Sequence, residues 1–490
     1  MNIFSRQLSS IIAAKEINIT QMSSFCKIDR SSMYKIVHGT RKPSSEALVQ
    51  LMALYMKLTP EETGVLMEKY RIIQTGAEHY FRRKTVVAFL QRCFEYNPPL
   101  SPSIFFSPLD VSLSDPDQAS RVLNGESNVL STFSYLFQRV KKQPDSHIYI
   151  RMPPDRRTMD IIRTVCGDAD GHSRKKIQIE HIFALDENKV LPDSDVRNIN
   201  VMSTMLPVLK NISNYNLYYY YANLLTGNRA FLFLPCAVIT DEYALQFSED
   251  LQFGLLHRQP ETVTFFKKTF NEIKSGCIPL TVQIRDHRDL LYCNSQRRNG
   301  NNFVSFHMHF GLDFILNERT LEKYVKKELS DRSFIKSSML EISKKDMQFL
   351  DTANATLIIS EKGVRDFMET GILPDYPLER YDSIEPEDRV LLLCDYMEMI
   401  REHGASLRII RELFGNTSSR NRIWVDDRLI CIHLQDISGA GKVILIRDPG
   451  LLSLLNDYFR NIPENICMSP EASMDILKNI LNEYSARYSV

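Results

Sequence analysis

The chain has 490 residues, of which 43% are hydrophobic and 24% charged, and its 60 basic side chains balance 60 acidic ones. This composition is ordinary for a soluble globular protein, and the balanced charge of the whole chain indicates no particular partner. A chain of this length is too long for one hydrophobic core, so we expect two or three domains.

The cysteines and the apolar segments indicate the compartment. The nine cysteines are scattered, and no two of them have CxxC spacing, which is typical of reduced thiols in a cytoplasmic protein. The first residues lack the layout of a signal peptide, and no apolar run reaches about 18 residues. We therefore expect a cytoplasmic protein without a membrane partner.

Residues 1–75 have the caps and the apolar spacing of five short helices. Asn18 followed by Gln21 predicts a capping box at the start of the second helix. The fourth helix is predicted to open at Pro43 and Ser44, with Leu48, Leu51 and Met52 facing inward. Thr59, followed by proline and two glutamates, predicts the start of the fifth helix.

The third predicted helix has one apolar and one polar face. Asp29 is suited to cap its start and Gly39 to end it. Met33 and Ile36 take core positions three residues apart, with Val37 beside them. The side chains left on the outward face are those of Arg30, Ser31, Tyr34 and Lys35.

The segments 28–36 and 39–44 resemble the lambda-repressor-like, XRE-type helix-turn-helix family of DNA-binding proteins, and the resemblance covers about residues 3–72. It implies a five-helix domain whose third helix enters the major groove. In that family the start of this helix and a residue one turn later meet base edges, which here implies Arg30, Ser31, Tyr34 and Lys35. The resemblance implies phosphate contacts from Thr20, Gln21, Thr40, Arg41 and Lys42.

Three positions depart from the family pattern. Lys27 stands where the family often has glycine, which is tolerable if Lys27 does not need a positive φ. Val37 replaces a common acid and His38 a common asparagine. The chemistry of the exposed face still suits DNA, because arginine and lysine can bind guanine edges while phosphate contacts set the register. The alternative is a small helical bundle whose solvated charges serve protein binding.

Residues 76–100 are predicted to form a connector. We expect a helix that packs on the rest of the chain or pairs across a dimer. Its basic run, Arg82 to Lys84, could touch the DNA backbone or form a solvated face. The prolines between residues 97 and 102 predict a domain boundary.

The remainder of the chain alternates predicted strands and helices, which favours α/β layers. Strands are predicted at 147–152, 176–185, 216–221, 230–239, 302–310, 355–359, 407–413, 429–434 and 442–446. Helices are predicted at 128–142, 157–166, 201–210, 262–274, 321–329, 364–369, 388–403, 451–460 and 471–488. The fold class is therefore α+β and multidomain, with an all-α domain followed by a mixed α/β body.

A short pattern recurs three times in this body, at residues 239–247, 359–367 and 446–454. In each case an apolar strand end is followed by an acid and then by apolar residues three and six positions beyond it. An acid suits the start of a helix, so we predict three strand-to-helix corners. The pattern suggests two related halves, 101–285 and 286–490, although it could also arise by chance.

The sequence offers little sign of catalysis. It contains no phosphate-binding glycine loop, no GxSxG and no HExxH. His307 and His309 would point to the same side of a strand. That strand is apolar on both faces, however, and no thiolate or acid adjoins it in sequence. We therefore predict no metal site, no cofactor and no enzyme.

Four consecutive tyrosines, residues 218–221, are the other notable feature. Alternation along a strand sends Tyr218 and Tyr220 to one side. Tyrosines can line a ligand pocket or a partner interface, and they can equally lie at the rim of a sheet. We take Tyr218 and Tyr220 as the candidate ligand-pocket residues.

Together these features predict a bacterial, cytoplasmic, sequence-specific transcriptional regulator. Residues 1–75 would bind double-stranded DNA as part of a homodimer. The body would dimerise and respond to an unknown small-molecule or protein effector. Two alternatives remain: an enzyme or toxin-like effector whose DNA-binding module regulates its own promoter, and a protein-interaction module.

Overall fold

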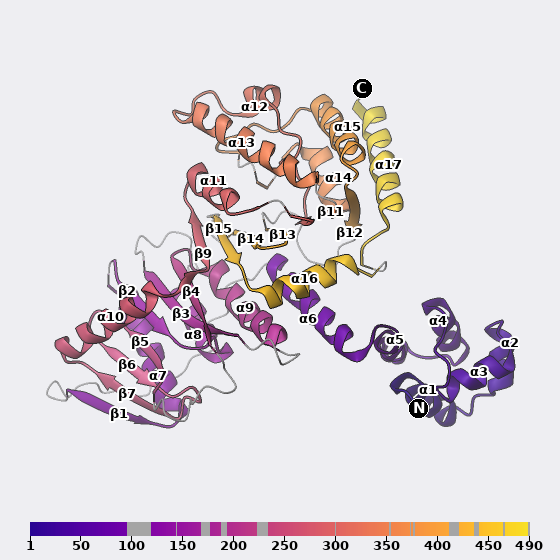
Figure 1. The fold of residues 1–490 in the computed structure, drawn as a ribbon, viewed down its shortest axis with the longest axis horizontal. Helices are drawn as coiled ribbons and strands as arrows, with labels where there is room; N and C mark the ends of the chain where they lie inside the picture. The colour runs from indigo at the N-terminus through magenta and orange to yellow at the C-terminus, as the bar shows by residue number, and fades with distance from the viewer. Residues whose placement is uncertain are drawn as a thin grey trace. The chain divides into compact units, whose positions relative to one another are not determined.

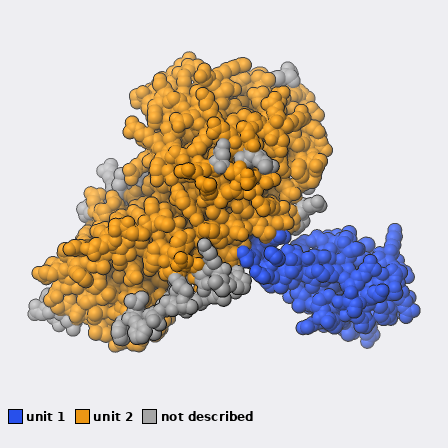
Figure 2. Space-filling model, viewed as in Figure 1, with its two compact units in different colours: residues 1–86 blue, residues 87–490 orange. Residues whose placement is uncertain are grey.

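The computed structural model describes residues 1–95, 119–143, 145–167, 177–187, 194–222, 234–298, 300–351, 354–372, 374–375, 378–410, 421–435, 441–463 and 466–488. The chain divides into two compact units, Met1–Val86 and Val87–Val490 (Figure 2). Within the described residues the fold is mixed α/β, with seventeen helices and two mixed sheets (Figure 1). No helix of this part of the chain is both long and apolar enough to cross a membrane.

The first unit is all helical. Its helices are α1 (Ile3–Ala14), α2 (Ile19–Phe25), α3 (Arg30–Val37), α4 (Glu46–Tyr55), α5 (Pro60–Thr75) and the start of α6 (Ala77–Phe94). Thr59 forms the predicted capping box with Glu62. At α2 the Asn18 side chain accepts hydrogen bonds from the N–H groups of Thr20 and Gln21. The predicted reciprocal bond is replaced, because the Gln21 side chain accepts from the Tyr55 hydroxyl.

Two details of the predicted fourth helix are wrong. The helix begins at Glu46 rather than at Pro43, because the Ser45 side chain accepts the Leu48 N–H and supplies the cap. Leu51 is 37% exposed, and Val49 is the fully buried residue instead. The buried residues Leu48, Val49, Met52 and Ala53 are spaced three and four apart, and Leu51 lies beside this stripe rather than in it.

The α1 and α3 helices approach closely in this unit. Ser5 is fully buried and its hydroxyl donates to the Ile36 carbonyl at 3.0 Å. A Cβ on Gly39, which has a φ of +80°, would lie 2.8 Å from the Ser5 Oγ. Glycine at this position therefore satisfies both the backbone conformation and the packing, as predicted for the end of α3.

Lys27 has a φ of +54° in the turn between α2 and α3. Lysine is expected to be tolerable at this position only without a positive φ, and the φ observed here is positive. Its N–H donates to the Ser24 carbonyl at 3.2 Å. A non-glycine residue in this region costs about 1–2 kcal/mol, and the exposed lysine side chain leaves the surrounding core unchanged.

The second unit contains two sheets. The first is built from β1 (Ser120–Asn124), β2 (His147–Arg151), β3 (Gln178–Asp186), β4 (Tyr215–Ala222), β5 (Cys236–Ile239), β6 (Ala244–Phe247), β7 (Phe253–His257) and β8 (Ile278–Pro279). Its helices are α7 (Glu126–Lys141), α8 (Arg156–Cys166), α9 (Ser194–Asn211) and α10 (Pro260–Ser275). The strand order is β1-β7-β6-β5-β2-β3-β4-β8.

The second sheet is built from β9 (Thr281–Ile284), β10 (Asn302–His307), β11 (Asn354–Ser360), β12 (Ser406–Ile410), β13 (Arg422–Asp426), β14 (Ile430–Gln435) and β15 (Gly441–Ile446). Its helices are α11 (His287–Ser295), α12 (Glu318–Tyr324), α13 (Arg332–Leu350), α14 (Glu361–Thr370), α15 (Pro386–Glu402), α16 (Pro449–Arg460) and α17 (Pro470–Tyr488). The strand order is β12-β11-β10-β13-β14-β15-β9.

The two sheets repeat one strand order. In the first, β2, β3 and β4 are parallel, and β5, β6, β7 and β1 continue antiparallel from the other edge of β2. In the second, β10, β11 and β12 take the parallel positions, and β13, β14, β15 and β9 the antiparallel ones. The second copy begins at β9, and β8 adds one short strand beside β4.

Two of the three predicted strand-to-helix corners are present. β11 leads directly into α14 at Glu361, and β15 leads into α16, where the Asp448 side chain accepts the Leu451 N–H. The third is wrong, because Asp241 lies in a hairpin between the antiparallel strands β5 and β6. An acid after an apolar strand suits a polar turn as well as a helix N-terminus.

The end of α6 belongs to the second unit, where residues next to both sheets contact it. Phe94 packs edge-on against Phe306 of β10, with ring centroids 4.8 Å apart. Lys210, near the end of α9, donates to the carbonyls of Arg92 and Glu95. Asn421, just before β13, donates to the Cys93 carbonyl at 2.7 Å. These donors satisfy carbonyl groups that a helix end leaves free. The predicted proline-rich boundary at 97–102 lies outside the described residues.

Candidate functional site

The outward face of α3 has the composition that the sequence predicts. Arg30, Ser31, Tyr34 and Lys35 are exposed. On the opposite face Met33, Ile36 and Val37 are at most 5% exposed and lie in the core of the first unit. The face is therefore free within its unit to meet a partner.

The first turn of α3 is ordered by its cap. Asp29 accepts hydrogen bonds from the Ser32 N–H at 2.8 Å and from the Ser31 hydroxyl at 2.7 Å. The Ser32 and Ser31 bonds hold the pKa of Asp29 well below its usual range. The Arg30 guanidinium lies over the Tyr34 ring, 5.4 Å from its centroid. Two of the predicted base-contacting side chains thus rest on each other.

The predicted phosphate-contacting residues lie at two places. Thr20 and Gln21 are exposed in the first turn of α2. Thr40 donates to the Lys35 carbonyl, and Arg41 donates to the Ser32 hydroxyl at 2.8 Å, so both are held against α3. Lys42 is exposed beside them. Thr40 and Arg41 are thus tied directly to the helix that carries the predicted base contacts.

The basic run of α6 is partly neutralised by acids. Arg82 pairs with Glu78 at 3.4 Å, and Lys84 pairs with Glu68 at 2.7 Å. The Glu68 pair raises the pKa of Lys84, chiefly through its hydrogen bond. These pairs favour the prediction that this run is a solvated helix face over the prediction that it contacts the DNA backbone.

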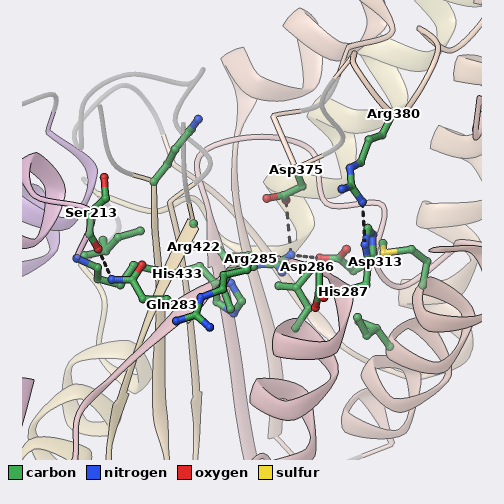
Figure 3. Close-up of a pocket in the computed structure, with 18 of the residues that line it drawn as sticks. Ser213, Gln283, Arg285, Asp286, His287, Asp313, Asp375, Arg380, Arg422 and His433 are labelled. Carbon is green, nitrogen blue, oxygen red and sulfur yellow. Dashed lines mark hydrogen bonds and ion pairs between the residues drawn. The ribbon is translucent and has the colours of Figure 1, made fainter. Parts of the chain in front are cut away.

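A cavity of about 590 Å³ lies in the second unit and is lined from both halves of the body (Figure 3). Ser213 and Asn214 come from the segment between α9 and β4. The other side comes from β9, α11, the loops after β10 and α14, and the facing ends of β13, β14 and β15. The carboxyl end of β10 and the start of its antiparallel neighbour β13 meet here, which is the position where open α/β sheets bind ligands.

The cavity wall carries both signs of charge. Arg422 pairs with Asp313 at 2.5 Å and lies 3.6 Å from Asp375. Arg380 donates toward the Nδ1 of His287, and Figure 3 shows these two side chains facing each other. Burial lowers the pKa of His287, as it does the pKa of His433, so both imidazoles are neutral near pH 7.

The predicted tyrosine pocket is not part of this cavity. Tyr218 and Tyr220 are half-buried and pack in an apolar cluster with Ile182, Val263 and Phe270, under α10. Lys274 lies 5.6 Å above the Tyr218 ring. Tyr218 and Tyr220 lie outside the cavity because α10, which follows β7 much later in the chain, packs on this face of β4.

The expectation for His307 and His309 is also wrong in one respect. The sequence places no acid beside them, but Asp375 from the loop after α14 does adjoin. The His309 Nε2 lies 3.3 Å from the Asp375 Oδ2. No signal in the sequence links these positions, because 66 residues (375 minus 309) separate them.

Comparison with known proteins gives no family. No family model matches the chain, and no curated protein matches it. Among solved structures, phosphatidylserine synthase from Haemophilus influenzae Rd KW20 is 9% identical, with a TM-score of 0.24 over 76% of this chain and 93% of that one. TrmBL2, an archaeal chromatin protein with a novel mode of DNA binding, is 10% identical, with a TM-score of 0.20 over 34% of this chain and 55% of that one. Both scores are too low to carry an argument.

Proposed function

We propose that this protein is a sequence-specific transcriptional regulator that binds double-stranded DNA through the first unit. The third helix, α3, would enter the major groove, with Arg30, Ser31, Tyr34 and Lys35 toward base edges. Thr20, Gln21, Thr40, Arg41 and Lys42 would contact phosphates. The protein would act in the cytoplasm as a homodimer on paired half-sites.

One observation carries this proposal: the division of α3 into a buried apolar face and an exposed face rich in hydrogen-bond donors. Arginine and lysine side chains on such a helix can reach guanine O6 and N7, and each good base contact contributes about 1–3 kcal/mol of discrimination. The attachment of Thr40 and Arg41 to α3 favours joint positioning of phosphate and base contacts.

The body would supply dimerisation and effector binding. The cavity of about 590 Å³ has the size of a small-molecule site. Its mixture of arginine, aspartate and neutral histidine favours a polar effector over an apolar one. The repeated strand order supports a body of two related halves, with the effector site in the second half near its border with the first.

The test is selection of genomic fragments by the full-length protein, followed by a fluorescence-anisotropy titration on the enriched sequence. The Arg30→Ala, Lys35→Ala double variant should lose about 5- to 150-fold in affinity per base contact, following from about 1–3 kcal/mol each. Lys57→Ala, which removes an exposed charge between α4 and α5, is the matched control and should change affinity little.

Salt dependence separates this proposal from a protein-interaction module. DNA binding through phosphates must weaken steeply as salt rises, because neutralised phosphates release counterions. An enriched sequence whose affinity is unchanged in the double variant would show that α3 does not read it. Failure to enrich any sequence, with salt-insensitive binding to another protein, would overturn the proposal.

A further inference from the structure

Three side chains that can bind a metal converge beside the cavity in the second half of the body. His307, at the end of β10, is 1% exposed, and His309, two residues later, is 2% exposed. Asp375 joins them from the loop after α14. One ligand atom from each residue lies within 4.8 Å of the other two.

The hydrogen bonds of His309 fix which nitrogen faces the aspartate. Its Nδ1 is 3.1 Å from the Phe310 carbonyl oxygen, which can only accept, so Nδ1 carries the proton. In the neutral ring Nε2 then carries a lone pair, and this nitrogen lies 3.3 Å from a carboxylate oxygen of Asp375. Two lone pairs at this distance repel, so either a proton on Nε2 or a metal cation must lie between the two atoms.

His307 has one ring nitrogen with a partner and one without. Its Nε2 lies 2.5 Å from the Ser305 hydroxyl, which also accepts from the Trp424 indole N–H at 3.2 Å. The other nitrogen, Nδ1, is buried and has no hydrogen-bond partner among the described residues. A buried polar atom without a partner destabilises the fold, and a bound ion would remove this cost.

The charges around the cluster are of both signs. The guanidinium of Arg422 faces two carboxylates, from Asp313 at 2.5 Å and Asp375 at 3.6 Å. The next buried pair along, Arg297 with Asp346, is balanced one to one. Burial lowers the pKa of His307, and Arg422 and Arg297 lower it further, so these two arginines oppose positive charge at this ring. An ion here would therefore be held by its three ligands rather than by the surrounding charge.

We propose that His307, His309 and Asp375 bind one divalent transition-metal ion of the zinc class. Two imidazole nitrogens and one carboxylate oxygen are a donor set that Zn²⁺ accepts, with bonds of about 2.0–2.2 Å. Two ligands of a tetrahedral ion with such bonds are about 3.4 Å apart, and the His309–Asp375 separation is 3.3 Å. Three protein ligands leave a fourth position, and Asp375 lines the cavity from which a further ligand can reach it.

The surroundings also supply the groups that orient metal-binding histidines. Such a histidine donates its other N–H to a carbonyl or hydroxyl group. Here the Phe310 carbonyl serves His309, and the Ser305 hydroxyl is placed to serve His307. Ser305 on β10 accepts from Trp424 on β13, so two paired strands fix the position of its hydroxyl.

The experiment uses the full-length protein, stripped with a chelator and titrated with Zn²⁺ by calorimetry and with Co²⁺ by visible absorption. We expect one high-affinity ion per chain and the d–d bands of low-coordinate Co²⁺. His307→Gln and Asp375→Asn should each weaken binding by more than tenfold, and Ser305→Ala by about 10- to 100-fold. Ellipticity of each variant reports that it is folded.

The matched control is His403→Gln. His403 also pairs with a carboxylate, that of Asp351 at 2.7 Å, but at a different place in the fold. It should bind the metal as the unchanged protein does. Equal binding in all variants, or the absence of an ion bound in unit stoichiometry, would overturn the proposal and leave His309 and Asp375 as a simple ion pair. Should His307→Gln unfold, Asp375→Asn decides, since its side chain lies in a partly exposed loop. Neither result depends on DNA binding.

Discussion

The core of the second half contains a buried ion pair whose removal should be costly. Arg297 and Asp346 are 1% and 0% exposed in their side chains and lie 2.5 Å apart. The Arg297 guanidinium also stacks 3.9 Å from the Trp424 ring centroid and 4.2 Å from that of Phe349. We predict that Arg297→Met, which keeps the apolar stacking but removes the charge, will destabilise this unit strongly.

The magnitude follows from burial. Removing one partner leaves the other charge uncompensated in the interior, which costs about 3–5 kcal/mol. The Arg297→Met, Asp346→Leu double variant removes both charges and should recover most of this loss. Lys478→Met, which breaks an exposed pair with Asp475, should cost less than about 1 kcal/mol.

The effect must also depend on pH, and its sign follows from Asp346. Burial raises the pKa of this carboxyl from 3.8 to about 6, against the lowering effect of Arg297. Without Arg297 the folded-state pKa rises further, so above pH 6 the variant retains a proton that the unchanged protein has lost. The stability difference should therefore widen as pH rises above 6, by up to about 1.4 kcal/mol per unit.

Urea unfolding followed by tryptophan fluorescence measures this directly. Trp424 is the only tryptophan in the sequence, and it lies against the substituted side chain. A buried charge is not the cause if Arg297→Met lowers the free energy of unfolding by under about 1 kcal/mol at pH 7.5, or by the same amount at pH 5.5 and pH 7.5.

Two further outcomes are expected. Gly39→Ala should destabilise the first unit by about 1–3 kcal/mol in thermal unfolding, because the φ of +80° and the Ser5 hydroxyl 2.8 Å from the new Cβ both oppose it. Gly64→Ala in α5 is the control: its new Cβ meets nothing within 4 Å, so it should stabilise the unit slightly. An equal loss in both variants would show that φ and packing at Gly39 are not the cause. Burial lowers the pKa of Lys210 from 10.5 to about 8, so the cost of its charge is present below pH 8 and is relieved as pH rises toward 10.5. The stability of the unchanged protein relative to Lys210→Met should accordingly rise between pH 8 and 10 in denaturant titrations, and a flat difference would contradict the burial argument.

Local signals predicted the first unit well because its helices are specified by nearby residues. Asp29, Gly39 and Thr59 each act within one turn of their own position, and the spacing of Met33 and Ile36 identifies the buried face. The two errors in α4 have separate origins. Proline suits a helix start, but Ser45, two residues later, supplies the cap, and two adjacent apolar stripes in α4 leave the choice between Val49 and Leu51 open from sequence alone.

The body was harder to predict where burial obscures periodicity. The segments of β13 and α13 were missed, although α13 is 19 residues long. Every residue of β13 is buried, including Arg422 and Asp426. Its charged ends hide the apolar pattern by which a buried strand is predicted from sequence. In α13 the apolar positions are interrupted by buried Ser338, Ser343 and Asp346.

The polar centre beside the cavity could not have been predicted from local sequence. Its members are far apart in the chain, and Asp375 reaches His309 only because β10 and the loop after α14 meet at the end of one sheet. Four consecutive tyrosines stand out in the sequence, but α10 packs on the face of β4 that carries Tyr218 and Tyr220. A functional site assembled by topology has no periodicity or spacing by which it could be recognised.

The attachment of α6 has a consequence for the two halves of the body. Lys210 belongs to the first half and Asn421 to the second, and both donate to carbonyls of the same final helical segment. Any movement of the two halves relative to each other alters the spacing between these donors. That helical segment must then shift with them or give up a bond, so the distance between the halves is registered at the end of the helix that continues into the first unit.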